Sequence, residues 1–120
     1  MKHKTMMALY HNPRCSKSRD ALNLLREQGI EPEIILYLET PPDAKTLKSL
    51  LTALGISPRE LLRKGEDDYK TLGLADTTLS DSALINAMVA HPKLIERPIA
   101  IKDGKAVIGR PPENVLQLLA

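Results

Sequence analysis

The chain has 120 residues, of which 42% are hydrophobic and 27% are charged, values typical of one compact soluble domain. A net charge of +2 and the absence of Phe and Trp argue against nucleic-acid binding, which needs a basic face or aromatic rings for base stacking. A single cysteine cannot form an internal disulfide, and three scattered histidines lack metal-ligand spacing, so we expect no bound metal or cofactor.

The first forty residues predict a strand, a helix and a second strand. A basic N-terminus leads into the short apolar run Met6–Tyr10, which suits a buried strand but is too short for a signal peptide or a membrane span. We therefore expect a cytoplasmic protein that does not enter a membrane, in a compartment that keeps the thiol reduced. The next helix has Asn12 or Ser16 as its cap and ends at Gly29, and Ile34–Leu38 forms the second strand. The apolar face of this first helix consists of Ala21, Leu22, Leu24 and Leu25.

The middle of the chain, about residues 43–92, is predicted to be entirely helical. Fifty residues would form only a thin core by themselves, so we expect a helical insertion packed on the rest of a single domain, 1–120. The signals in chain order are a helix start at Thr40–Asp43, a stop at Gly55, a capping box at Ser57–Glu60, a solvated charged turn at Lys64–Asp68, a helix start at Ser80–Asp81 and a stop at His91–Pro92.

The C-terminal part predicts a β-hairpin followed by a last helix. Strands at Ile99–Ile101 and Ala106–Ile108 flank Asp103–Gly104, a pair that favours a type I′ turn. Pro111–Glu113 then begins the last helix. The order strand, helix, strand, helices, hairpin, helix predicts an α/β fold with a four-stranded mixed sheet flanked by helices.

Cys15 lies where the first strand passes into the first helix. The free N–H groups and the dipole of a helix N-terminus stabilise an anion, which favours thiolate over thiol. Arg14, Lys17 and Arg19 add positive charge to the same segment, with Ser16 among them. A lone cysteine is commonly a small buried side chain, but these polar neighbours do not form an apolar pocket. We therefore predict an activated thiol beside an oxyanion-binding loop.

Three further polar residues are candidates to support this loop. Asn12 and Ser18 are expected to hold it through bonds from side chain to backbone. His11 either polarises the thiol or is a structural residue that fixes the loop.

Arg63, Arg97 and Arg110 lie at boundaries between predicted elements. The planar guanidinium suits tetrahedral oxyanions, although any one such arginine is more commonly a solvated surface residue. Arg97 and Arg110 each precede a proline at a strand end, where the backbone is rigid. Pro98 is a candidate for a cis peptide bond, which costs a proline only about 0.5–1 kcal/mol over trans.

Three motifs together resemble the glutaredoxin-coupled arsenate reductase family: residues His11–Arg19, Glu96–Ile99 and Gly109–Glu113. The resemblance covers nearly the whole chain and implies a thioredoxin-like fold with a helical insertion and a cis-proline at Pro98. It also implies reduction of arsenate to arsenite with glutathione as co-substrate and glutaredoxin as partner, and a substrate that is arsenate or a related oxyanion. By position, Cys15 matches the nucleophile, and the arginines around the oxyanion are matched by Arg63, Arg97 and Arg110.

The loop departs from the well-characterised plasmid-type enzymes, because Ser16–Lys17 stands where they have Gly-Thr; this version is similar to a chromosomal branch. Two alternatives follow. One is a general glutathione-linked thiol oxidoreductase that does not act on arsenate. The other is an Spx-like regulator that binds RNA polymerase, but those proteins commonly carry Cys-x-x-Cys, and Ser18 holds the second position here. We expect the protein to be a monomer. Because the chain has one cysteine, any redox cycle on it needs an external thiol.

Overall fold

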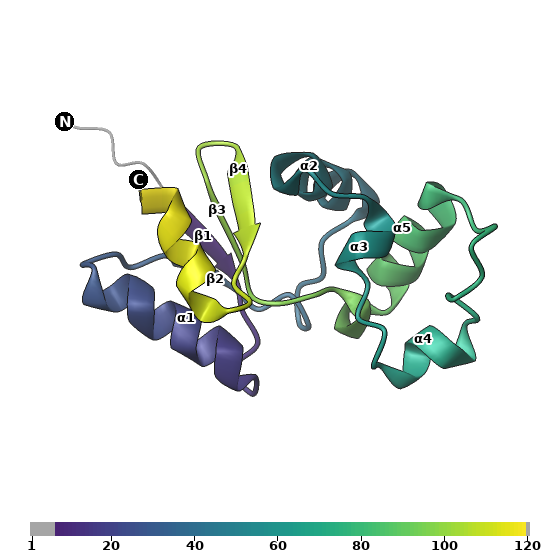
Figure 1. Cartoon of the computed structure of the whole chain (residues 1–120), viewed down its shortest axis with the longest axis horizontal. Helices are drawn as coiled ribbons and strands as arrows, with labels where there is room; N and C mark the ends of the chain where they lie inside the picture. The colour runs from purple at the N-terminus through teal and green to yellow at the C-terminus, as the bar shows by residue number, and fades with distance from the viewer. Residues whose placement is uncertain (1–6, 120) are drawn as a thin grey trace. The chain divides into compact units, whose positions relative to one another are not determined.

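The computed structural model describes residues 7–119, which fall into two compact units (Figure 1). The first takes the chain up to Thr40 and again from Arg97, and the second is Pro41–Glu96. The second unit corresponds closely to the helical insertion expected at about residues 43–92. We describe each unit by itself, and the expectation of a single domain stays a prediction.

The first unit contains a four-stranded mixed sheet, as predicted, and the structure shows the strand order β2-β1-β3-β4 (Figure 1). Its strands are β1 (Met7–Tyr10), β2 (Glu33–Ile35), β3 (Ile99–Lys102) and β4 (Lys105–Ile108). β1 runs parallel to β2 and antiparallel to β3, and β3 runs antiparallel to β4. The parallel pair places the end of β1, and the loop after it, beside the end of β2.

The second strand is shorter than the predicted Ile34–Leu38. It covers Glu33–Ile35, after which the N–H groups of Glu39 and Thr40 both donate to the Leu36 carbonyl at 2.9 Å and turn the chain. Leu36–Leu38 is therefore a turn, although its apolar side chains resemble those of a strand.

Two helical segments of the first unit pack against each other and against the sheet. They are α1 (Ser16–Glu27) and the 3₁₀ helix η2 (Pro112–Leu119), drawn in yellow in Figure 1, where the sequence predicted the last helix. Alternate residues of the strands face them, as the two-residue period of a strand requires. The buried cluster consists of Met7, Leu9, Ala21, Leu22, Leu25, Ala100 and Val115.

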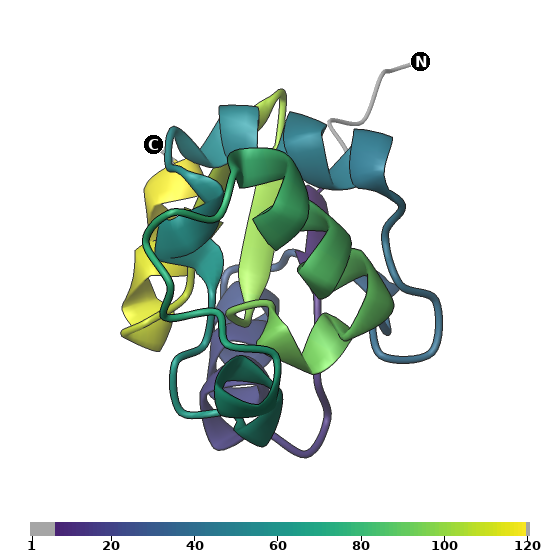
Figure 2. The same ribbon diagram turned by 90° about the vertical axis from the view of Figure 1, so that its right-hand side faces the viewer.

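The second unit is helical, as predicted, and α5 contacts α2, α3 and η1 within it (Figure 2). The predicted caps are confirmed: the side chains of Asp43, Ser57 and Ser80 each accept from a backbone N–H of the first turn. The segments are α2 (Ala44–Leu54), α3 (Pro58–Leu61), α4 (Asp67–Thr71), α5 (Asp81–Ala90) and η1 (Pro92–Leu94).

The charged segment Lys64–Asp68 is only partly the predicted turn. Asp67 and Asp68 form the first residues of α4, where their carboxylates lie at the positive end of the helix dipole. An isolated bridge between Leu62 and Ile95 joins two other parts of this unit.

The structure confirms the predicted type I′ turn of the hairpin and the predicted cis peptide bond before Pro98. Asp103 and Gly104 have φ of 54° and 75°, as a type I′ turn requires, and the Arg97–Pro98 bond is cis. The Arg110–Pro111 bond is also cis, which the sequence analysis did not anticipate. Across residues 7–119, no helix is long and apolar enough to cross a membrane.

Candidate active site

Cys15 is the N-cap of α1, the position we had assigned to Asn12 or Ser16. It has an extended backbone, with φ −93° and ψ 122°. Its carbonyl accepts from the N–H of Arg19 at 3.0 Å, and its own N–H donates to the Asn12 carbonyl at 3.0 Å. The sulfur is thus directed at the N–H groups of the first helical turn while it stays partly accessible.

The pKa of the Cys15 thiol is lowered from its ordinary value. Burial, the largest single influence, acts in the opposite direction and raises the pKa. Hydrogen bonds from the backbone N–H groups of Ser18 and Lys17 outweigh it, together with a hydrogen bond and the positive charge from Arg97. The thiolate predicted from the strand–helix junction therefore has two sources of stabilisation, the helix N-terminus and Arg97.

Ser18 fixes the loop from inside the protein. Its side chain is fully buried, and its Oγ accepts from the Asn12 N–H at 3.0 Å and lies 2.7 Å from Nδ1 of His11. The pKa of His11 is lowered by burial and by the charges of Arg26 and Arg19, so the imidazole is held in its neutral form. Of the two roles considered for His11, these contacts favour fixing the loop.

Some of the remaining loop residues form hydrogen bonds within the loop, and others are exposed to solvent. Asn12 Oδ1 accepts from the N–H of Arg14 at 3.0 Å, and Arg19 Nη1 donates to the Pro13 carbonyl at 2.9 Å. Ser16 and Lys17 are exposed on the first turn of α1. Arg19 therefore contributes to the loop's shape as well as to its charge.

The structure brings Arg97 and Arg110 together, and Arg97 in turn provides a hydrogen bond to Cys15. Arg110 Nη1 donates to the Arg97 carbonyl at 3.2 Å, and the Gly109 N–H donates to the Pro98 carbonyl at 2.8 Å. A Cβ on Gly109 would lie 2.8 Å from Cγ of Pro98 and 3.0 Å from Cγ1 of Val115. The two Arg–Pro segments are therefore packed so closely that only glycine fits between them.

Arg63 belongs to the second unit. There its Nη1 lies 3.2 Å from Oε2 of Glu66 and its Nε lies 3.4 Å from Oε1 of Glu96. Two carboxylates therefore hold its guanidinium within that unit. Its expected place around the oxyanion stays a prediction.

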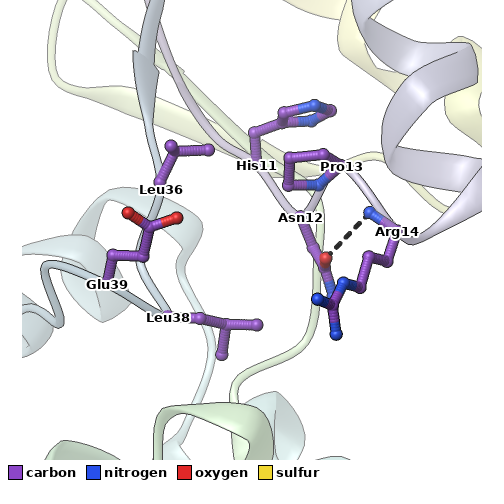
Figure 3. Close-up of a pocket in the computed structure, with 7 residues that line it drawn as sticks. All are labelled: His11, Asn12, Pro13, Arg14, Leu36, Leu38 and Glu39. Carbon is purple, nitrogen blue, oxygen red and sulfur yellow. Dashed lines mark hydrogen bonds between the residues drawn. The ribbon is translucent and has the colours of Figure 1, made fainter.

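A pocket of about 300 Å³ opens on the β2 side of the cysteine loop (Figure 3). Loop residues 11–14 form one wall, and the turn after β2 forms the other with Leu36, Leu38 and Glu39. Within the described residues, neither Arg14 nor Glu39 forms an ion pair with another side chain. The sequence analysis missed this pocket because it assigned Leu36 and Leu38 to a buried strand.

The sequence analysis also assigned no structural role to two residues beside the arginines: Gly109, and Asn114, whose Nδ2 donates to the Arg110 carbonyl at 3.1 Å. The glycine directly before Arg110 was a visible signal of close approach, but Asn114 has the sequence appearance of any polar residue on a terminal helix.

Comparison with known proteins places these features in a family. A model described as the ArsC family matches residues 10–118. The chain is 64% identical to YfgD of Escherichia coli K12 over 92% of this chain and 94% of that protein. It is 50% identical to an arsenate reductase of Neisseria meningitidis, over 92% and 96% of the two chains. Among solved structures, an arsenate reductase from Vibrio cholerae has a TM-score of 0.93 and 52% identity, covering 96% of this chain and 98% of that one.

Proposed function

This chain belongs to the ArsC family, and from that membership we propose that it reduces arsenate to arsenite with Cys15 as nucleophile, glutathione as co-substrate and a glutaredoxin as final reductant. The single observation that best supports this proposal is the lowered pKa of Cys15, which lies at a helix N-terminus and receives a hydrogen bond from Arg97. The same groups that stabilise a thiolate also suit the oxygens of a bound oxyanion.

In the first step, the Cys15 thiolate attacks arsenic, an S–As bond forms, one As–OH bond breaks, and the hydroxyl takes a proton from solvent and leaves as water. The N–H groups at the start of α1 and the guanidinium of Arg97 stabilise the charge on the remaining oxygens. We propose that Arg110 and Arg63 complete the oxyanion site, as the resemblance implies.

In the second step, a glutathione thiolate attacks the sulfur of Cys15. An S–S bond forms, the S–As bond breaks, and its electron pair stays on arsenic, which leaves as arsenite. The chain has no second cysteine to resolve this disulfide. A glutaredoxin thiolate therefore attacks the glutathione sulfur and releases the Cys15 thiolate. We propose that this cycle runs in the cytoplasm on a monomer.

The test is arsenate-dependent NADPH oxidation coupled through glutathione reductase, glutathione and glutaredoxin. The wild-type protein should turn over arsenate, and Cys15→Ala should lose this activity. Ser16→Ala is the matched control, because Ser16 is an exposed neighbour in the same turn. Full activity in Cys15→Ala would exclude the proposed nucleophile, and an inactive wild type would exclude arsenate as substrate.

A second candidate function is a glutathione-linked thiol oxidoreductase that acts on peptide thiols. The pocket beside the cysteine loop favours it, because apolar Leu36 and Leu38 line the pocket together with the charged Arg14 and Glu39, a combination that suits an extended peptide (Figure 3). In the same coupled assay, turnover of a glutathionylated peptide without arsenate would select this candidate.

A further inference from the structure

The last helix, η2, reaches the Arg–Pro segments through Asn114. The side-chain nitrogen of Asn114, Nδ2, donates to the Arg110 carbonyl at 3.1 Å and to the Ile108 carbonyl at 3.3 Å. Two carbonyl oxygens face this atom, and only the nitrogen side of the amide, which carries two N–H groups, satisfies both. Asn114 therefore ties together the two sides of Gly109.

The contacts continue from Asn114 to the thiol in three steps. Asn114 holds the Arg110 carbonyl, and Arg110 in turn donates through Nη1 to the Arg97 carbonyl at 3.2 Å. Arg97 provides the side-chain hydrogen bond to Cys15. The first link is local, four residues apart, the next two join segments that are distant in the sequence, and the whole path lies inside the first unit.

Asn114 is well placed to hold these segments still. The next residue, Val115, is fully buried in the core cluster with Leu22 and Leu25 of α1. Asn114 also donates from its backbone N–H to the Pro111 carbonyl at 3.0 Å, so η2 begins without using its side chain. The register of β3 and β4 ends at the pair Ile99–Ile108, so the Arg110 carbonyl lies beyond the last paired residues.

We propose that Asn114 is a positioning residue, which acts through Arg110 to hold Arg97 against the Cys15 thiolate. Its effect on the thiol does not depend on the substrate, and only its effect on oxyanion binding rests on the proposed function. Asn114 itself touches neither the thiol nor the reacting atoms.

The experiment measures the pH dependence of Cys15 alkylation by iodoacetamide in the full-length protein. In Asn114→Ala the Arg97 segment is free to shift, so the thiol pKa should rise, and alkylation at neutral pH should slow by roughly threefold, the effect of one weakened hydrogen bond. Gln117→Ala is the matched control. Its Nε2 donates to the Oδ1 of Asn114 at 3.4 Å, and its removal leaves both donations from Asn114 Nδ2 in place.

A double-mutant cycle tests the route of the effect. Arg97→Ala should raise the thiol pKa by itself, and adding Asn114→Ala to it should then raise the pKa no further. A residue that only stabilised the fold would lower the melting temperature without changing the thiol pKa of the folded protein. Asn114→Leu keeps a similar side-chain volume but lacks N–H donors and adds no charge, so it should match Asn114→Ala and provides the same measurement if the alanine variant does not fold.

A wild-type thiol pKa in both Asn114 variants would overturn the inference, as would an undiminished effect of Asn114→Ala in the Arg97→Ala background. The proposed function is tested separately, because alkylation needs no arsenate. An inactive wild type that still shows the Asn114 shift would leave this inference standing and reject only the substrate.

Discussion

At the scale of single residues, the cysteine loop depends on buried polar atoms that satisfy one another. Ser18 Oγ receives the Asn12 N–H and contacts Nδ1 of His11, and all three residues surround the turn that leads to Cys15. The sequence analysis correctly assigned Asn12 and Ser18 to support of the loop. It left the role of His11 open because the choice depends on what surrounds the imidazole.

The lowered pKa of His11 predicts a contribution to the pH dependence of stability. In the unfolded chain this imidazole takes up a proton near its ordinary pKa of 6.5, whereas burial and the charges of Arg26 and Arg19 oppose protonation in the folded protein. Its contribution to the free energy of unfolding is therefore present above about pH 6.5 and is lost as the pH falls below that value.

The measurement is urea unfolding at pH 7.5 and 5.5 for the wild type and for His11→Gln. The other titrating groups are common to both proteins, whereas the His11 imidazole is present only in the wild type. The wild type should therefore lose more stability than the variant between pH 7.5 and pH 5.5. Equal losses in the two proteins would show that His11 is not held neutral by the fold.

At the scale of elements, the active site depends on how closely β4 and η2 bring the two Arg–Pro segments together. Gly109 lies between Pro98 and Val115 at distances that no side chain fits. The sequence marked Pro98 as a cis candidate but did not reveal that its ring packs against residue 109.

Gly109→Ala should therefore disturb both stability and the thiol. The added methyl group overlaps Pro98 and Val115, so we expect a loss of about 1–3 kcal/mol in the free energy of unfolding and a rise in the Cys15 pKa as Arg97 shifts. Urea unfolding and alkylation against pH measure the two effects. Gly65→Ala is the control, since nothing lies within 4 Å of its added Cβ, and its stability should change by less than about 1 kcal/mol. Equal behaviour of the two variants would contradict the close packing at Gly109.

At the scale of the whole molecule, the number of thiols limits the chemistry. The chain has one cysteine, so the proposed disulfide with glutathione cannot pass to another thiol of the same chain. The proposed cycle therefore stops at this species when the external reductant is missing.

Omitting glutaredoxin should accordingly trap one glutathione on each chain. Intact-mass spectrometry after incubation with arsenate and glutathione would show a single adduct, and peptide mapping would place it on Cys15. Adding glutaredoxin should remove it, and incubation without arsenate serves as the control. A chain that turns over arsenate without ever forming this adduct would require a different second step.

The sequence alone determined the features that depend on neighbouring residues. The capping box at Ser57–Glu60, the turn at Asp103–Gly104 and the thiol at the start of α1 follow from side chains and backbone preferences within a few positions. The tertiary structure decided the early end of β2 at Ile35 and the path from Asn114 to Arg97. The end of β2 depends on where its pairing with β1 stops. The path from Asn114 to Arg97 depends on how the Arg–Pro segments pack, and Arg110 and Arg97 are 13 residues apart in the sequence.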